Sequence, residues 1–266
     1  MSQSGTIAIV TGAAGGMGAP SAKRLAGAGH ALLLVDLHAD RLEAEAGALR
    51  AQGATVETMA GDIADPAFPA ALIAALAGRE ISALVHTAGL SPTMADGARI
   101  MEVNYFATER LTDAVAPHMA AGACAVLISS CSAYMVRSAE VDGAIAQLVE
   151  GDASVAQHFQ GSPQQAYPFT KRAVIALVAN RAAVFGARGA RIASIAPGLI
   201  DTGMGRAEFQ ASPQTKVMLE RTPLGRLGIG DEIASAAAFL CSKDASFISG
   251  CDIKVDGGVL AAIGMA

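Results

Sequence analysis

The sequence has few aromatic and few charged residues. Among its 266 residues there is no tryptophan, only three are tyrosine, and charged residues make up 16%. Hydrophobic residues make up 52%, a composition typical of proteins whose strands are buried on both faces of a sheet. The net charge of −5 has no basic cluster behind it. We therefore expect no nucleic-acid partner.

The chain also lacks the patterns of membrane, secreted and metal-binding proteins. No apolar run approaches the length that spans a bilayer, so we expect no membrane partner. Residues 1–5 have neither the basic region nor the apolar core of a secretory signal. The four cysteines show no C-x-x-C spacing and no clustered histidines, which predicts that there is no metal site. Reduced thiols and no targeting signal indicate a cytoplasmic protein.

Short apolar runs alternate with longer amphipathic stretches along the whole chain. This alternation is typical of β-α-β units and a parallel sheet covered on both faces. It predicts one domain over residues 1–266, an α/β fold with a doubly wound sheet of about seven strands. We expect strands at residues 7–10, 31–35, 55–59, 83–85, 125–129, 191–195 and 252–255. We expect helices at residues 17–28, 39–52, 66–77, 99–119, 165–185 and 231–240.

One segment, at about residues 133–164, interrupts this alternation. It is polar, irregular and partly helical, with turn signals at Asp142-Gly143 and Gly151-Asp152. It is either a plain surface insertion or a segment that covers the substrate pocket or alters subunit contacts. Further along the chain, residues 203–221 are also predicted to be loops that line the substrate pocket.

A glycine-rich turn follows the first predicted strand. Gly12, Gly16 and Gly18 are spaced so that the backbone can approach a dinucleotide pyrophosphate at the start of the next helix. Glycines alone are weak evidence for a dinucleotide-binding site, because glycines are also common in ordinary turns. Asp36 ends the second predicted strand, where a carboxylate accepts hydrogen bonds from the adenosine ribose. No lysine or arginine lies within residues 13–17 or directly after Asp36 to bind a 2′-phosphate, which favours NAD over NADP. The alternative interpretation is that Asp36 merely ends its strand and does not contact the cofactor.

Tyr167 and Lys171 are four positions apart in a predicted helix, so their side chains share one face. Such a pair is usually just two polar residues. However, a lysine ammonium beside a tyrosine stabilises the phenolate and lowers its pKa from about 10, which suits it to proton transfer. Pro168 follows the tyrosine, so we expect Tyr167 in the first turn of its helix, where proline is tolerated.

Taken with further motifs, these residues resemble the short-chain dehydrogenase/reductase family over essentially the whole chain. The matching motifs are Thr11-Gly12 with Gly16 and Gly18, Asp62-Ile63, Val103-Asn104, Ser129-Ser130, Tyr167 with Lys171, residues 197–202 and Asp256-Gly257-Gly258. The resemblance implies a Rossmann-type fold. It assigns cofactor contacts to Gly12, Gly16, Met17, Gly18, Asp36, Leu37, Asp62, Ile63, Ala88, Gly89, Tyr167, Lys171, Pro197, Gly198, Ile200 and Thr202.

The same resemblance implies four catalytic residues. Ser130 would hydrogen-bond the substrate oxygen, and Tyr167 would act as the acid/base. Lys171 would tune the tyrosine and contact the nicotinamide ribose, and Asn104 would hold a water in a proton relay. The chain departs from the family at His86, where an asparagine is usual, and we expect this histidine to be structural or to lie on the adenosine side.

The implied activity is NAD-dependent interconversion of a secondary alcohol and a ketone. From position 130 to position 167 there are 37 positions, much more than the family usually has. Such an insertion is similar to the bacterial 3α-hydroxysteroid dehydrogenase/carbonyl reductase subgroup. This similarity makes a hydroxysteroid or another bulky apolar carbonyl compound a reasonable substrate.

Several alternatives remain open at this point. The chain can instead be an NADP-linked ketoacyl or carbonyl reductase, or a catalytically silent dinucleotide-binding regulator on the same scaffold. An enoyl reductase is less favoured, since those relatives space tyrosine and lysine more widely. The resemblance also implies a homodimer or homotetramer, formed through the helices predicted at residues 99–119 and 165–185.

Overall fold

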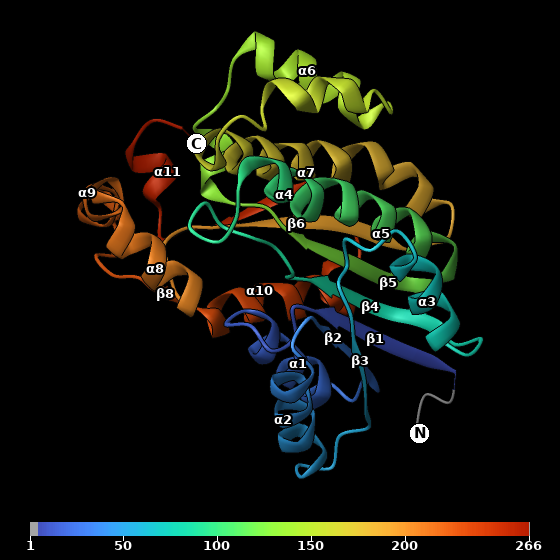
Figure 1. The fold of residues 1–266 in the computed structure, drawn as a ribbon. Coiled ribbons are helices and arrows are strands. Elements are labelled where there is room, and N and C mark those ends of the chain that lie inside the picture. Colours follow the sequence, from blue (N-terminus) through green and yellow to red (C-terminus); the bar gives the residue numbers. More distant parts are fainter. Residues whose placement is uncertain (1–4, 266) are drawn as a thin grey trace.

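A seven-stranded parallel sheet forms the centre of the protein, in a computed structural model that describes residues 5–265 (Figure 1). Its strand order is β3-β2-β1-β4-β5-β6-β9, and every neighbouring pair is parallel. All seven strands that the sequence predicts are present, so the doubly wound α/β fold is confirmed. The strands are β1 Thr6–Thr11, β2 Leu32–Asp36, β3 Val56–Ala60, β4 Glu80–His86, β5 Met119–Ile128, β6 Arg191–Pro197 and β9 Asp252–Val255.

The sheet separates two apolar cores. Successive side chains of β1 point to opposite faces: Ile7 and Ile9 belong to one buried cluster, and Ala8 and Val10 to the other. Because both faces are covered, the central strands read as continuous apolar runs rather than as alternating ones. This burial accounts for the high hydrophobic content of the chain.

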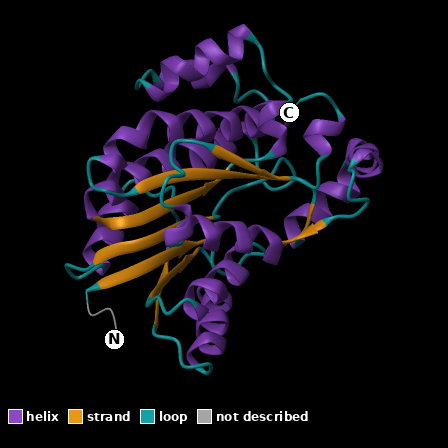
Figure 2. Ribbon diagram, turned by 180° about the vertical axis from the view of Figure 1, so that it is seen from behind, coloured by secondary structure: helices purple, strands orange, loops and turns teal. Residues whose placement is uncertain are grey.

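Helices cover each face, as Figures 1 and 2 show from opposite sides. One face carries α1 Gly18–Gly27, α2 Ala39–Arg50 and α10 Gly230–Cys241, and the other carries α3 Phe68–Ala75, α4 Gly97–Met101, α5 Thr108–Val115 and α7 Pro163–Gly186. Short elements η5 Lys243–Ala245 and α11 Val259–Ala262 flank β9. Within residues 5–265, a helix both long and apolar enough to span a bilayer was not found.

The helix predicted over residues 99–119 is interrupted. After α4 the chain forms a π-helical segment, η1 Glu102–Ala107, before α5, and a 3₁₀ turn, η2 Ala116–His118, leads directly into β5. Single π-helical turns inside α-helices are frequent at functional sites. Here the segment contains Asn104, one of the residues predicted to be catalytic.

Residues 203–221, which read as loops in the sequence, are helical. Thr202 begins α8 Gly203–Ala211 by accepting a hydrogen bond from the Gly205 N–H at 3.0 Å. Pro213 stands at the start of α9 Pro213–Arg221, where its missing N–H costs nothing. A two-stranded parallel ribbon, β7 Ile200–Asp201 with β8 Gly228–Ile229, fixes the base of these helices. The prediction failed because both helices are short and bury no side chain completely.

The irregular segment after β5 folds as η3 Cys131–Tyr134, α6 Ala139–Val149 and η4 Ala153–His158. Helix α6 lies on the outer side of α7 (Figure 1). Phe159 stacks on the buried Phe169 of α7, with ring centroids 4.0 Å apart. Met135, Val136 and Gln164 of this segment line the substrate pocket, whereas residues 139–163 do not, so the segment borders the pocket at its two ends but does not cover it with α6 or η4.

Helix α7 begins earlier than predicted. Ser162 accepts a hydrogen bond from the Gln165 N–H, and Pro163 is the first helical residue. Tyr167 therefore lies in the second turn, and Pro168 is inside the helix rather than at its start. A proline at that position cannot donate to the carbonyl of Gln164 four residues before. Gln164 and Pro168 both line the pocket that is described in the next subsection.

Candidate active site

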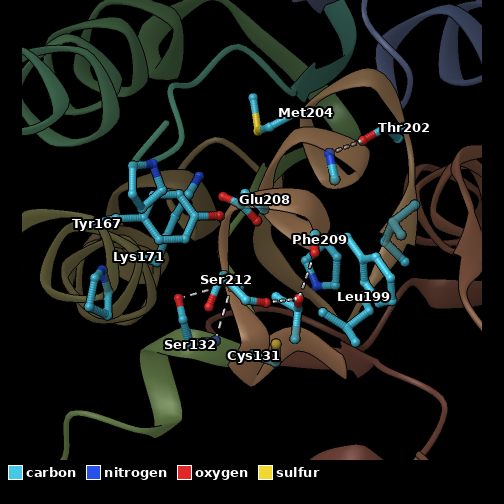
Figure 3. Close-up of a pocket in the computed structure, with 18 of the residues that line it drawn as sticks. Cys131, Ser132, Tyr167, Lys171, Leu199, Thr202, Met204, Glu208, Phe209 and Ser212 are labelled. Atoms are coloured by element: carbon cyan, nitrogen blue, oxygen red, sulfur yellow. Dashed lines mark hydrogen bonds between the residues drawn. The ribbon is translucent and has the colours of Figure 1, made fainter. Parts of the chain in front are cut away.

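A pocket of about 560 Å³ lies at the carboxyl edge of the sheet. Parallel α/β sheets bind their ligands at this edge. Its walls come from the ends of β4, β5 and β6, from the N-terminal part of α7, and from α8 and α9 (Figure 3). Much of the lining is apolar, including Leu90, Met135, Val136, Leu199, Met204 and Phe209.

The glycine turn between β1 and α1 has room for backbone but not for side chains. Gly12 has φ +65°, and a Cβ there would lie 2.8 Å from the Ala88 nitrogen. A Cβ on Gly16 would lie 2.7 Å from the Thr202 side chain, and one on Gly18 would overlap the Gly12 carbonyl. Met17 precedes α1 without capping it by its side chain. The backbone of this turn can therefore approach a dinucleotide pyrophosphate at the start of α1, although the Ala19 N–H already bonds to the Gly15 carbonyl and Pro20 has no N–H.

Asp36 faces this turn from the end of β2. Its carboxylate accepts hydrogen bonds from the Ala14 N–H at 3.0 Å and the His38 N–H at 3.1 Å. Two oxygens with several lone pairs leave acceptor capacity for ribose hydroxyls. A cation that the sequence reasoning missed also reaches the turn: Arg41 donates to the Ala14 carbonyl at 2.9 Å. Arg41 is five positions after Asp36, so it lies outside residues 13–17 and is not directly after Asp36.

Two of the predicted cofactor contacts, Asp62 and Ile63, follow β3. Asp62 accepts from the Ala64 N–H at 2.9 Å and pairs with Arg99 at 2.6 Å. Ile63 is buried, whereas Leu37 after β2 is 59% exposed. The strand ends are adjacent, because the Gly61 N–H bonds to the Asp36 carbonyl. The predicted cofactor contacts after β2 and after β3 therefore lie at neighbouring strand ends.

The other end of the predicted cofactor site is packed around Gly89. A Cβ at this position would lie 3.2 Å from Asn104 Oδ1 and 3.5 Å from Lys171 Nζ. The structure therefore brings Asn104 and Lys171, from different helices, to the same loop after β4. Ala88 precedes this loop glycine and packs against the glycine turn.

The loop after β6 closes the same side. Gly198 packs so closely on Asp256 that a Cβ would lie 2.7 Å from the Asp256 Cα. Pro197, Gly198, Ile200 and Thr202 all line the pocket. These four predicted cofactor contacts thus line the same pocket as the predicted acid/base.

Tyr167 and Ser130 meet in the pocket. Burial and the negative charge of Glu208 raise the pKa of the Tyr167 phenol above its usual value, while a hydrogen bond with Ser130 opposes the rise. This differs from the lowered pKa expected from Lys171, because burial disfavours the phenolate more than its neighbours stabilise it. In the chain alone the phenol is protonated, and it can act as a proton donor.

Lys171 is buried, and its ammonium lies 5.8 Å from the centre of the Tyr167 ring. Its Nζ donates to the Ile128 carbonyl at 2.9 Å. Burial lowers the pKa of Lys171 to about 8, against the opposing effect of the Glu208 charge. The ammonium is thus predominantly charged at neutral pH and retains two further N–H donors for a ligand.

The Asn104 side chain is engaged with the loop after β4. It accepts from the Leu90 N–H at 2.8 Å and donates to the Leu90 carbonyl at 2.9 Å. These two bonds orient the amide beside Lys171. The side chain therefore positions the loop in the structure, and its predicted role in holding a water stays a prediction.

His86 and Tyr134 are structural rather than part of the pocket. His86 is buried, with its two ring nitrogens bound to Thr11 at 2.7 Å and Thr108 at 2.9 Å. Burial and the Lys171 charge lower the pKa of His86 to about 3, so it is neutral at pH 7, in agreement with the structural role expected for it. Tyr134 donates to Asp252 at 2.8 Å.

Sequence reasoning missed one acidic residue in the pocket. Glu208 of α8 points toward Tyr167 and Lys171 (Figure 3). It is the only Asp or Glu between Thr202 and Leu219, which could have singled it out. Because the segment was predicted to be a loop, the sequence did not indicate which of its side chains point into the pocket. As for metals, residues 5–265 contain no group of three histidine, cysteine, aspartate or glutamate residues able to hold an ion.

Comparisons with known proteins agree with this geometry. A family model described as enoyl-(acyl carrier protein) reductase matches residues 12–149 and 142–260. The 3-alpha-hydroxysteroid dehydrogenase/carbonyl reductase of Comamonas testosteroni is 30% identical over 262 residues, 96% of each chain. D-threitol dehydrogenase of Mycolicibacterium smegmatis is 32% identical over 96% of this chain and 92% of its own.

Among solved structures, the 3-alpha-hydroxysteroid dehydrogenase of Pseudomonas sp. B-0831, complexed with NADH, superposes with a TM-score of 0.80. It is 30% identical and covers 97% of this chain and 98% of its own. The chain belongs to the short-chain dehydrogenase/reductase family. It is an oxidoreductase of the class that interconverts alcohols and carbonyl compounds with NAD(P).

Proposed function

We propose that this protein is an NAD-dependent dehydrogenase/reductase for a secondary alcohol and its ketone, with Tyr167 as the acid/base. The observation that carries the proposal is the meeting of Tyr167, Ser130 and Lys171 in one pocket beside a glycine cradle. The three come from the end of β5 and from α7, and their convergence is what proton transfer at a substrate oxygen needs.

In the reductive direction, Ser130 and Tyr167 hold the carbonyl oxygen of the substrate. A nicotinamide held by the predicted cofactor contacts would supply the hydride for the carbonyl carbon. Tyr167 then gives its phenolic proton to the oxygen that has become negative. Lys171, charged and fixed by the Ile128 carbonyl, stabilises the phenolate left behind. In oxidation Tyr167 accepts the proton of the alcohol instead.

Asp36 supports NAD as the cofactor. Its carboxylate faces the glycine turn and would repel the 2′-phosphate of NADP while accepting bonds from free ribose hydroxyls. Arg41 is the observation that favours the alternative, an NADP-linked reductase, because its guanidinium reaches the same turn. We favour NAD, since a phosphate at Arg41 would still lie near the Asp36 charge.

The apolar lining supports a bulky apolar substrate, including a hydroxysteroid. The pocket of about 560 Å³, part of which the nicotinamide would fill, has the size of a site for drug-sized ligands. A 3-alpha-hydroxysteroid dehydrogenase/carbonyl reductase is among the relatives over the full chain length. We further propose a cytoplasmic homodimer or homotetramer, as is usual for members of the family.

Tyr167→Phe tests the assignment. Turnover of any substrate found in a screen of secondary alcohols and ketones, steroids included, should fall by roughly 10³-fold or more, because the proton donor is absent. Binding of NADH, measured by fluorescence, should be retained. The matched control is Tyr134→Phe, which removes a hydroxyl that bonds to Asp252 outside the pocket.

Normal turnover in Tyr167→Phe would overturn the role of the tyrosine. A protein that binds NADH tightly but oxidises or reduces no member of the screen would favour the silent regulator. Parallel measurement with NADP(H) separates the proposed enzyme from an NADP-linked ketoacyl reductase.

A further inference from the structure

Glu208 is an acidic group in a largely apolar pocket. It lies on α8, between Met204 and Phe209 of the pocket wall, and its side chain points toward Tyr167 (Figure 3). Its charge acts on Tyr167, Lys171 and Cys131. The carboxylate therefore borders the position at which the substrate oxygen must lie.

One of its two oxygens has an unmet hydrogen-bonding requirement. A hydrogen bond with Ser91 engages the Glu208 carboxylate. Glu208 Oε1, however, is buried and has no hydrogen-bond partner. Leaving a buried carboxylate oxygen unpaired costs free energy that a ligand with a donor group would recover.

Neither Lys171 nor Tyr167 satisfies this open oxygen. Lys171, the cation whose charge acts on Glu208, already donates to the Ile128 carbonyl, and no ion pair between it and Glu208 is formed within 4.0 Å among the described residues. The Tyr167 hydroxyl is the group that the proposed chemistry needs for the reacting oxygen. Glu208 Oε1 thus remains for a second group on the substrate.

We propose that Glu208 is a specificity-determining residue that accepts a hydrogen bond from a second hydroxyl of the substrate, close to the reacting carbon. The preferred substrate is then a secondary alcohol with a neighbouring hydroxyl, or the corresponding hydroxyketone, on an otherwise apolar body. A substrate with a carboxylate or sulfonate at that position is disfavoured by charge repulsion. The inference rests on the proposed function and makes its substrate class more specific.

The experiment compares trans-1,2-cyclohexanediol with cyclohexanol, which differ only by the second hydroxyl. With NAD, the wild-type ratio of kcat/KM should favour the diol by roughly tenfold to a hundredfold, the effect expected for a hydrogen bond to a charged group. Glu208→Leu should bring the ratio close to one. Glu208→Gln, which keeps an acceptor oxygen but no charge, should give an intermediate ratio. Glu220→Leu on α9 is the matched control, because Glu220 is exposed and outside the pocket.

A binding readout separates this inference from the proposed chemistry. Tyr167→Phe with NAD should show a larger thermal shift with the diol than with cyclohexanol, and the added Glu208→Leu change should remove the difference. This measurement does not need turnover, so failure of the proposed reaction would leave its result intact. Equal binding of the two alcohols, or no binding of either, would overturn the inference. A Glu208→Leu variant with altered NADH affinity but an unchanged diol preference would also overturn it.

Discussion

His86 Nδ1 lies 2.7 Å from Thr11 Oγ1, which ties the end of β4 to the end of β1 directly behind the glycine turn. The opposite ring nitrogen reaches Thr108 at the start of α5. One neutral imidazole therefore joins two strands and a helix at the place where an asparagine is usual in the family. Since burial lowers the pKa of His86 to about 3, protonation of this group opposes folding.

The His86→Asn substitution should make the protein less sensitive to acid. Unfolded histidine gains a proton below about pH 6.5, whereas folded His86 gains one only near pH 3. The wild type should thus lose about 2 kcal/mol of stability from this group between pH 6.5 and pH 5. Denaturant unfolding at pH 7 and pH 5 measures the loss. His158→Asn, at an exposed position, is the control, and identical pH dependence in His86→Asn and wild type would contradict the prediction.

Lys171 differs from His86 in the pH range over which it affects stability. Its folded pKa of about 8 lies below the unfolded value of 10.5, so the unfolded chain binds more protons between these values and stability rises with pH there. Relative to Lys171→Met, the wild type should gain about 2–3 kcal/mol from pH 8 to pH 10. Urea unfolding of both proteins across this range gives the difference. Lys216→Met, on the exposed side of α9, should parallel the wild type, and a Lys171→Met curve that does the same would refute the buried ammonium.

Asp36→Ala should reduce the preference for NAD over NADP by roughly tenfold or more, because a repulsive charge and a ribose acceptor are both removed. Ratios of kcat/KM with the two coenzymes measure this change. In the Asp36→Ala background, Arg41→Ala should weaken NADP binding, since Arg41 is the cation that reaches the turn. Asp40→Ala is the neighbouring control at an exposed site. An unchanged coenzyme ratio in Asp36→Ala would show that Asp36 only ends its strand.

Phe159→Ala should destabilise the protein without changing the pocket. The stacked ring on Phe169 joins the segment after η4 to α7, and its removal from a half-buried site should cost about 1–2 kcal/mol. The KM for NADH should stay at the wild-type value, because residues 139–163 do not line the pocket. Thermal unfolding and steady-state kinetics check both parts. Gln157→Ala is the exposed control, and a large rise in KM would mean that the segment reaches the site after all.

The sheet was predictable because local patterns and tertiary packing agree along it. The five inner strands are short apolar runs between turn signals, and the less buried edge strands β3 and β9 continue the alternation with helices, so all seven could be found without knowing their order. The glycine turn and Asp36 could be found in the same way, since their spacing follows from one β-α-β unit. The breaks in this agreement were the π-helical segment around Asn104 and the start of α7, where Ser162 and Pro163 set the boundary and Tyr167 comes a turn later.

What the sequence determined by itself was the sheet, the place of the cofactor cradle and the Tyr167–Lys171 pair, because each depends on neighbours a few positions apart. Only the tertiary structure decided the electrostatics of the pocket. Glu208, Arg41 and the burial of Lys171 depend on contacts between elements far apart in the chain, and burial changes the cost of charge without leaving a local pattern. The pair therefore indicates the kind of chemistry, while its protonation and the choice of substrate depend on the residues that fold around it.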